Sequence, residues 1–262
     1  MDRLFDLAFV RPPPSSYVNC VSANPDRSNI DLSLARRQHQ QYVSTLRESG
    51  IIVVELSPLE QFPDSVFMQD PALVGRSVIV VGRFGEERRR GEESVFAEDV
   101  ANSNTRVGEM CYVSSPGTLE GGDIVVTENG LFVGESARTN TTGIQQLSAC
   151  LYGLPVKPVK TNLMHLLCGC SYLTDREMII APELINVEAF SGIRFVTVPK
   201  EEAYACDCLY VGERRVIIPS GFPKAAANLK RAGYRPIEVD MSEFYKGDGG
   251  VTCLSSPVYK LF

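Results

Sequence analysis

Cys253 has the sequence context in this chain that is best suited to a nucleophile. It follows Gly249 and Gly250, and a double glycine lets the backbone approach a ligand closely. A thiol becomes nucleophilic where a nearby positive charge favours the thiolate. His165, one of only two histidines, or a cationic substrate can supply that charge. Taken alone, each residue is as well explained by a structural role, so a joint function requires that the fold bring them together.

Two acidic segments offer partners for a cation. The segment FPDSVFMQDP contains Asp64 and Asp70, and the segment TLEGGD contains Glu120 and Asp123. On converging strands, two acids, one histidine and one cysteine would form a negatively charged pocket with a nucleophile. Such a pocket suits a planar cation such as guanidinium, because carboxylates pair with it through two hydrogen bonds. We expect Asp123 to be a turn residue or an orienting hydrogen-bond acceptor.

Two arginine contexts offer partners for an anion. Residues 88–90 are three arginines in the mixed-charge segment GEERRRGEE, for which a solvated loop is the simplest interpretation. Arg138 ends a strand-like segment and precedes a helix start that Thr139 or Asn140 would cap. Either context can bind a substrate carboxylate, and spacing alone does not decide between them.

Short β-rich segments alternate with helical segments along the chain. An apolar run, a polar turn and a second apolar run, the pattern of a hairpin, occur over 72–81, 124–134, 171–182 and 209–219. Helical periodicity predicts helices over 30–49, 92–103, 139–152 and 224–232. Further strands are predicted over 51–56, 195–198 and 236–239.

The recurring order of hairpin, helix and strand predicts one supersecondary unit repeated about five times. Equivalent points near the strands recur at intervals of 50, 45, 42 and 46 residues, at Asp70, Glu120, His165, Asp207 and Cys253. We therefore expect an α/β fold in a single domain over 1–262, with the two chain ends completing a ring. In a ring, equivalent positions of successive units converge on the central axis, so residues far apart in sequence can form one site.

Composition and charge exclude several classes of protein. With 44% hydrophobic and 22% charged residues the chain can bury a core, and it is neither disordered nor fibrous. A net charge of −6 argues against a nucleic-acid partner. No apolar run approaches the roughly 18 residues of a membrane helix, and the N-terminus lacks the pattern of a signal peptide. We expect a cytoplasmic protein without a membrane partner.

The eight cysteines are predicted to be reduced thiols, because no secretion signal accompanies them. The Cys-x-Cys pairs at 168/170 and 206/208 lie in apolar, strand-like runs. We expect them to be buried apolar residues rather than zinc ligands. His39 lies on the apolar face of the first predicted helix and is expected to be a core histidine with satisfied hydrogen bonds.

Together these motifs resemble the dimethylarginine dimethylaminohydrolases, a family of the guanidino-group-modifying superfamily that also includes the arginine deiminases. The resemblance extends from about Arg11 to the C-terminus and is carried by FPDSVFMQDP, LEGGD, GESARTN, HL at 165–166 and DGGVTCLS, in family order. It implies a five-bladed α/β propeller, the pentein fold, which agrees with the period found above.

The resemblance also implies the roles of the reacting residues. Cys253 would be the nucleophile, and His165 would be the general acid and then the general base. Asp70 and Glu120 would hold the guanidinium. The implied reaction is hydrolysis of N-methylated L-arginine to L-citrulline and a methylamine, through a covalent thiouronium on Cys253. It needs no metal and no cofactor, and a homodimer is compatible with it.

For the amino-acid end of the substrate, the resemblance implies that Arg89 and Arg138 bind the α-carboxylate. Asp64 and the carbonyl group of Gly247 would bind the α-amine. The loop over residues 12–23 would form a lid.

Val21 of this lid would cover the substrate. Two positions depart from related sequences. Gln69, expected beside the substrate, stands where the family usually has glutamate, so one negative charge is lost. Leu167 stands where arginine deiminases carry an aspartate that binds an unsubstituted guanidinium, which argues against arginine itself as substrate.

Two other functions remain open: a cysteine hydrolase or deiminase for another guanidino compound, and a non-catalytic methylarginine-binding protein or thiol sensor.

Overall fold

The computed structural model describes residues 3–262, which form fifteen β-strands and five α-helices joined by loops and short 3-10 turns. Three of its sheets have three strands each. In each of these sheets, the middle strand pairs antiparallel with the strand before it and parallel with the strand after it. The three sheets are β6–β7–β8 (Ile124–Thr127, Gly130–Glu135, Val156–Lys160), β9–β10–β11 (Cys170–Tyr172, Glu177–Ile180, Arg194–Thr197) and β12–β13–β14 (Leu209–Gly212, Arg215–Pro219, Arg235–Val239).

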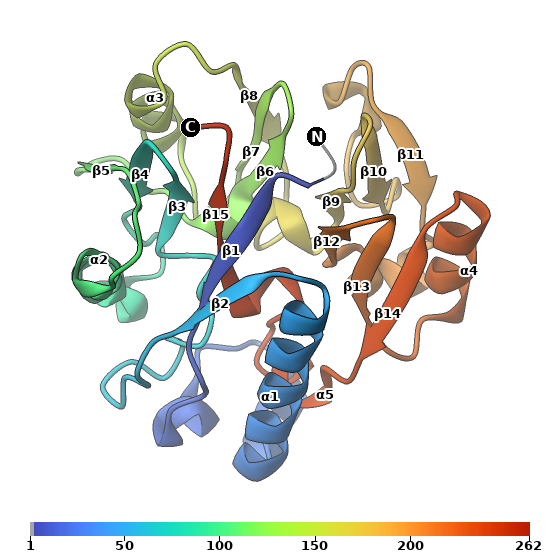
Figure 1. Ribbon diagram of the computed structural model, residues 1–262, viewed down its shortest axis with the longest axis horizontal. Helices are drawn as coiled ribbons and strands as arrows, with labels where there is room; N and C mark the ends of the chain where they lie inside the picture. The colour runs from blue at the N-terminus through green and yellow to red at the C-terminus, as the bar shows by residue number, and fades with distance from the viewer. Residues whose placement is uncertain (1–2) are drawn as a thin grey trace.

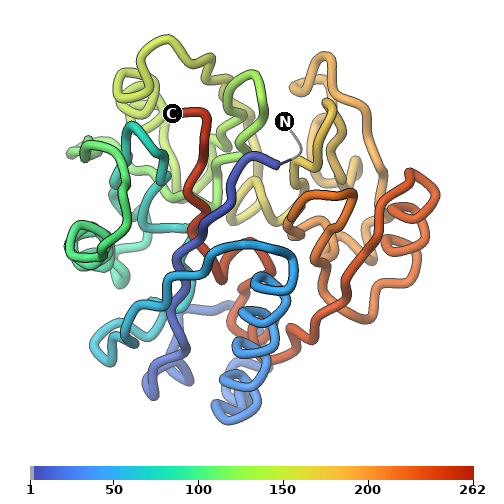
Figure 2. Tube along the Cα trace, viewed as in Figure 1, coloured from blue at the N-terminus to red at the C-terminus, as the bar shows by residue number. Residues whose placement is uncertain are grey.

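The fourth sheet has six strands and contains the same pairing pattern twice. Its strands, in spatial order, are β2 (Ile52–Glu55), β1 (Phe5–Val10), β15 (Ser255–Tyr259), β3 (Ala72–Gly75), β4 (Val78–Val81) and β5 (Glu109–Tyr112). β1 pairs antiparallel with β15 and parallel with β2, so strands from the two ends of the chain lie side by side (Figure 2). A short parallel contact between β15 and β3 joins the two halves of the sheet.

Helices cover the outside of this arrangement of sheets (Figure 1). Four of them lie between the second and third strands of a unit: α1 (Leu32–Glu48), α2 (Glu92–Asn102), α3 (Thr141–Cys150) and α4 (Pro223–Arg231). The unit β9–β11 has the 3-10 turn Val187–Ala189 at the corresponding place, and the short helix α5 (Ser242–Tyr245) follows β14. The starts of α1 and α3 are fixed by Asp31 and Asn140, whose side chains accept hydrogen bonds from backbone N–H groups in the first turn.

Two hairpin turns use residues with positive φ. Asp175 and Arg176 have φ of 53° and 59°, and Glu213 and Arg214 have φ of 54° and 60°. Two consecutive residues of this conformation form the type I′ turn, whose twist matches that of the strands it joins. The polar turns in the sequence therefore set the register of the hairpins β9–β10 and β12–β13.

The apolar runs of the sequence form the core. Every residue of β3, β6 and β12 is buried, which explains why these strands lack the alternating pattern of a half-exposed sheet. Buried side chains of α1 pack with those of β1, β12 and β13 in one apolar cluster. Side chains of β6 and β7 pack with those of α3 and β9 in another. Sheets and helices thus hold the N-terminal ends of the first strands in fixed positions.

The structure confirms the predicted α/β character, the four hairpins and the four helices, whose ends differ by only a few residues. It also confirms that the two chain ends pair with each other. The closed ring of five blades stays a prediction. Among the described residues, no helix is long and apolar enough to cross a membrane.

Two predictions about single residues are wrong. Cys111 and Cys150 form a disulfide between β5 and the end of α3, whereas all cysteines were expected to be reduced. The other six cysteines are free, as predicted. His39 is buried as expected, but its Nε2 atom has no hydrogen-bond partner within the described part of the chain. Neither result follows from local sequence, because both depend on which segments pack together.

Candidate active site

The five periodic residues occupy equivalent places in the fold, just ahead of the first strand of each unit. Asp70, Glu120, His165, Asp207 and Cys253 precede β3, β6, β9, β12 and β15 by a few residues each. Tight 3-10 turns follow Glu120 and His165 directly, so the chain changes direction where these side chains emerge. Hydrogen bonds and one shared cavity connect the five residues. The structure therefore brings together residues that are 183 positions apart at the extremes, Asp70 and Cys253.

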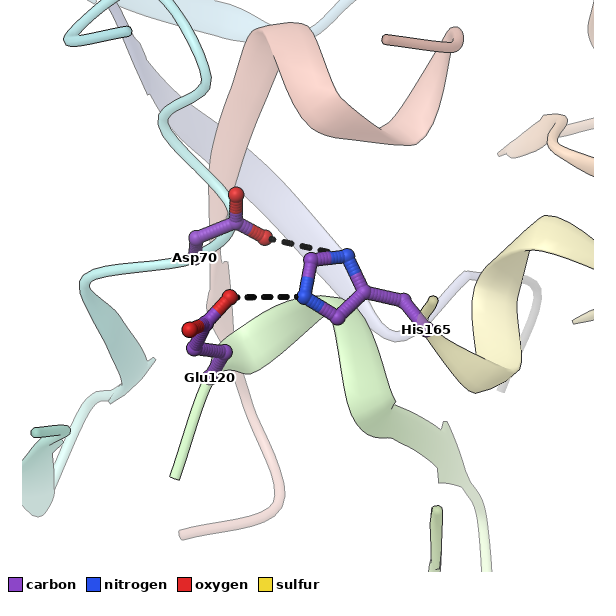
Figure 3. A group of neighbouring side chains, drawn as sticks. All are labelled: Asp70, Glu120 and His165. Atoms are coloured by element: carbon purple, nitrogen blue, oxygen red, sulfur yellow. Dashed lines mark hydrogen bonds and ion pairs between the residues drawn. The ribbon is translucent and has the colours of Figure 1, made fainter. Parts of the chain in front are cut away.

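His165 lies between two carboxylates, one facing each ring nitrogen (Figure 3). Its Nε2 atom is 2.8 Å from Oε2 of Glu120, and its Nδ1 atom is 3.8 Å from Oδ1 of Asp70. Burial acts to lower the pKa of His165, but the charges of Asp70 and Glu120 outweigh it and raise this pKa to about 9. At neutral pH the imidazole is therefore protonated and can act as an acid.

Glu120 is fully buried and accepts four hydrogen bonds. Oε1 accepts from the backbone N–H groups of Gly85 and Glu86, at 2.9 and 3.2 Å. Oε2 is shared by His165 and by Arg138, whose Nη1 atom is 3.1 Å away. Burial acts to raise the pKa of Glu120, but the hydrogen bond and charge of His165 prevail and lower it to about 2. Glu120 is thus a fixed negative charge at neutral pH.

Of the two carboxylate oxygens of Asp70, one has a hydrogen-bond partner among the described residues and the other has none. Its Oδ2 atom accepts a hydrogen bond of 2.6 Å from Nη1 of Arg89, and its Oδ1 atom is buried without a hydrogen-bond partner among the described residues. Arg89 is held by Glu92, which receives its Nε and Nη2 hydrogen bonds, and its guanidinium lies 4.4 Å from the ring centre of Phe84. The free oxygen of Asp70 faces His165, where it can accept a donor that a ligand brings.

Cys253 is buried, with 8% of its surface exposed, and lies in the 3-10 turn Thr252–Leu254. Its Sγ atom donates a hydrogen bond to Oδ2 of Asp207, at 3.8 Å. Burial and the negative charges of Asp207 and Asp70 raise the pKa of Cys253 well above its ordinary value. This environment favours the neutral thiol, and a cation beside it would be needed to favour the thiolate.

A small cavity of about 20 Å³ connects these groups. Its lining includes Asp70, Arg89, Arg138, His165 and Cys253, together with Val21, Asp64, Phe67, Met164 and residues 247–249. That volume admits roughly one water molecule, so a ligand the size of an amino acid requires side chains or a loop to move.

The loop that contains Val21 closes one side of the cavity. The backbone N–H of Val21 donates to both carboxylate oxygens of Asp64, at 3.0 and 3.1 Å. Next to it, the hydroxyl of Ser22 and the N–H of Ala23 donate to the carboxylate of Asp248, at 2.8 and 2.7 Å. These contacts tie the predicted lid to the body of the protein, and any opening of it would have to break these hydrogen bonds.

The expected ligands of an α-amino acid lie around the same cavity, but their polar groups are engaged. Asp64 is bonded to the lid, Arg138 to Glu120, and Arg89 to Asp70 and Glu92. Gly247 lines the cavity in the turn after α5. A bound carboxylate would have to compete with these internal ion pairs.

Gln69 and Leu167, the two positions at which this chain departs from related sequences, lie outside the cavity lining. The side-chain amide of Gln69 donates to the carbonyl oxygen of Gly121, at 3.2 Å, and lines a separate cavity together with Thr252. Leu167 is buried and lines that second cavity as well. A role of Gln69 in binding the substrate directly stays a prediction.

Sequence reasoning did not assign functions to three supporting residues. Glu92 holds Arg89, Thr139 accepts a hydrogen bond from the backbone N–H of Glu120, and Asp207 holds the loop of Cys253. Asp207 was visible in the sequence only as a periodic position. Glu92 and Thr139 gave no usable signal, because an acid in a helix start and a threonine before one are common. Asp123, expected as a turn residue or an orienting hydrogen-bond acceptor, lies in the 3-10 turn Gly121–Asp123 and accepts a hydrogen bond from the backbone N–H of Leu166 at 2.9 Å.

One oxygen or nitrogen atom from each of Asp70, Glu120 and His165 lies within 4.8 Å of the others, a spacing that could hold a metal ion. A metal ion there would have to displace the proton of His165, because an imidazolium has no lone pair for a metal. Two carboxylates that flank this imidazole, with one carboxylate oxygen lacking a partner among the described residues, also suit a hydrogen-bonding organic cation.

Comparison with known proteins defines the class of this fold and site. The sequence profile of the arginine deiminase family matches residues 58–208. The chain is 36% identical to N(G),N(G)-dimethylarginine dimethylaminohydrolase of Pseudomonas aeruginosa, over 96% of this chain and 99% of that protein. It is 33% identical to the protein of the same name from Streptomyces coelicolor, over 97% and 98% of the two chains.

A solved structure of the Pseudomonas aeruginosa enzyme, a mutant complexed with citrulline, superimposes with a TM-score of 0.89 at 34% identity, over 97% of this chain and 100% of that one. The fold is therefore the α/β pentein fold. The chain belongs to the arginine deiminase and dimethylarginine dimethylaminohydrolase family, whose members are hydrolases of guanidino carbon–nitrogen bonds.

Proposed function

We propose that this protein hydrolyses N-methylated L-arginine, as asymmetric dimethylarginine or monomethylarginine, to L-citrulline and a methylamine. The observation that carries the proposal is the buried Oδ1 atom of Asp70, which has no hydrogen-bond partner among residues 3–262 and faces His165 at the cavity that Cys253 lines. A guanidinium N–H placed there would satisfy this oxygen and bring its carbon to the thiol. The names of the Pseudomonas and Streptomyces relatives support the methylated substrate.

The contact between Arg89 and Asp70 supports a guanidinium ligand in a second way. Arg89 is itself a guanidinium, and it pairs with Asp70 at 2.6 Å. The carboxylate therefore has the position and charge to hold such a group. A substrate guanidinium would take the free oxygen of Asp70 and compete with Arg138 for Glu120.

In the proposed reaction, the positive charge of the substrate favours ionisation of the Cys253 thiol. The thiolate forms a bond to the guanidinium carbon, giving a tetrahedral adduct. His165, already protonated, donates its proton to the departing methylamine as the carbon–nitrogen bond breaks, and a thiouronium remains on the sulfur. Neutral His165 then takes a proton from water, whose oxygen attacks the same carbon. The carbon–sulfur bond breaks, and citrulline and the thiol are released.

For the rest of the substrate, the proposal places the α-carboxylate at Arg138 and Arg89 and the α-amine at Asp64 and the carbonyl of Gly247. All four residues line the cavity. Opening of the loop at Val21 frees Asp64 for the amine. A pentein of five blades, with these residues at its centre, is part of the same proposal.

The alternative is a hydrolase for another guanidino compound. Gln69 favours it, because an amide that donates to the carbonyl of Gly121 stands where relatives usually have an acid. Arginine itself is disfavoured, since the buried, apolar Leu167 offers no carboxylate to an unsubstituted guanidinium.

A substrate panel tests the proposal. Purified protein is incubated with asymmetric dimethylarginine, monomethylarginine, arginine and agmatine, and citrulline and released amines are measured, with Cys253→Ser as the matched control. We expect citrulline and methylamines from the two methylated compounds only, and none from the control. Turnover of arginine alone would replace the proposal with a deiminase. Turnover of agmatine, which lacks a carboxylate, would remove the roles of Arg89 and Arg138. No product from any compound would refute the substrate assignment.

A further inference from the structure

Asp207 is a buried carboxylate that the proposed reaction does not use. It follows the 3-10 turn Lys200–Cys206 and precedes β12, the place in its unit that Asp70, Glu120 and His165 have in theirs. Only 3% of its surface is exposed. A buried carboxylate needs hydrogen-bond donors to compensate its charge, so the donors around Asp207 indicate the role of this residue.

Those partners belong to the loop that carries Cys253. Oδ1 of Asp207 accepts hydrogen bonds from the backbone N–H and the hydroxyl of Thr252, at 2.7 and 2.8 Å. Oδ2 accepts the thiol of Cys253 at 3.8 Å. A Cβ atom at Gly250 would lie 2.1 Å from Oδ2, so the loop approaches this closely only with glycine there. One carboxylate thus holds two successive residues of the loop, Thr252 and Cys253.

The charge of Asp207 also acts on the thiol. Burial raises the pKa of Asp207 to about 6, so the group is mostly ionised at neutral pH. Around Cys253, burial and the carboxylates of Asp207 and Asp70 raise the pKa of the thiol, as does Cys168, and a hydrogen bond from the N–H of Gly250 opposes them. His165, protonated, lines the same cavity but has its ring nitrogens directed to Glu120 and Asp70.

We propose that Asp207 is a positioning residue for the nucleophile: it anchors the loop through Thr252 and holds Cys253 as a hydrogen-bonded neutral thiol. The inference rests on the proposed role of Cys253 and deepens it. A thiol held by a negative charge reacts poorly with neutral electrophiles, and its ionisation is favoured only when a cation lies beside it. Asp207 therefore makes the nucleophile selective for a cationic substrate.

The first test compares the wild-type protein with Asp207→Asn, using iodoacetamide, a neutral reagent, and mass spectrometry of the peptide that contains Cys253. Asparagine keeps an oxygen for Thr252 but removes the charge and turns a donor toward the sulfur. We expect alkylation of Cys253 to be about tenfold faster at a given pH between 7 and 9, because a pKa lower by one unit gives about tenfold more thiolate. An unchanged or slower rate in a folded variant would overturn the proposal.

Thr252→Val is the matched control, since it removes one hydrogen bond from Asp207 and keeps the charge. We expect alkylation no faster than in the wild type, with kcat for monomethylarginine at least about threefold lower. Faster alkylation in this variant, or an unchanged kcat, would contradict the assigned roles, and this holds even if Asp207→Asn does not fold. The alkylation measurements need no turnover, so failure of the substrate assignment would leave them interpretable.

Discussion

The two histidines of this chain should titrate on opposite sides of their ordinary range. His165 lies between Asp70 and Glu120, which raise its pKa to about 9 against the effect of burial. His39 is buried in the first helix, and burial lowers its pKa to about 4 despite the charge of Glu55. Both shifts follow from where the fold places the rings, since an unperturbed histidine titrates near 6.5.

Glu120→Gln isolates the contribution of one carboxylate to His165. The variant removes the charge 2.8 Å from Nε2 and leaves an amide of the same shape. The pKa of His165 should then fall by at least about one unit, because Asp70 and Asp123 alone oppose burial. With a pKa near 9 the ring is about 90% protonated at pH 8, with one near 8 about 50%, and with one near 6.5 about 3%. Activity that requires this proton donor at pH 8 should therefore fall to about half or less in the variant and recover near pH 6.

The assay is a titration of the imidazole signals by NMR between pH 3 and 10.5, on protein without a histidine tag. Only two histidines contribute, and His39→Gln assigns them. We expect one midpoint near 9 that moves downward in Glu120→Gln and one near 4 that does not move. A pKa of His165 near 6.5 in the wild-type protein, or a pKa that does not change in Glu120→Gln, would refute the electrostatic argument for its role as an acid.

Two further predictions concern stability. Cys111→Ser opens a disulfide with a sequence separation of 39 residues and should lower the free energy of unfolding by about 3–4 kcal/mol in urea denaturation. Reduction of the wild-type protein should have the same effect, and equal stability of all three forms would contradict it. The neutral state of buried His39 should make the protein less stable in acid. The unfolded chain binds this proton near pH 6.5 and the folded chain only near pH 4, so stability is lost as pH falls through that window, by about 2–3 kcal/mol at pH 4.5. His39→Leu should show correspondingly less loss between pH 7 and 4.5, and an acid dependence identical to that of the wild type would show that His39 is not its source.

Arg89 lies in a different environment from the two arginines beside it in the sequence. In the sequence, three adjacent arginines look like a solvated loop, and Arg88 and Arg90 are indeed partly or largely exposed. Arg89 is buried, because the turn Glu87–Arg89 directs it toward Asp70 and Glu92. Nothing in the sequence separates the middle arginine from its neighbours apart from the family resemblance.

The hairpins, the helices and their order could be predicted from the sequence. These depend on interactions within a few residues, such as the apolar runs of β12 and β13 and the turn between them. The regular spacing of Asp70, Glu120, His165, Asp207 and Cys253 also predicted that they share a site, since repeated units place equivalent positions together.

The interactions of those residues depend on the packing of the whole fold. This packing paired His165 with Glu120, left one oxygen of Asp70 without a partner in the described part of the chain, and set Asp207 against the thiol of Cys253. The disulfide between Cys111 and Cys150 also depends on tertiary packing, because it joins two segments that are distant in the sequence. The pKa of a group and the partner of a side chain depend on distance and burial, and residues far apart in the sequence acquire both only when the sheets pack.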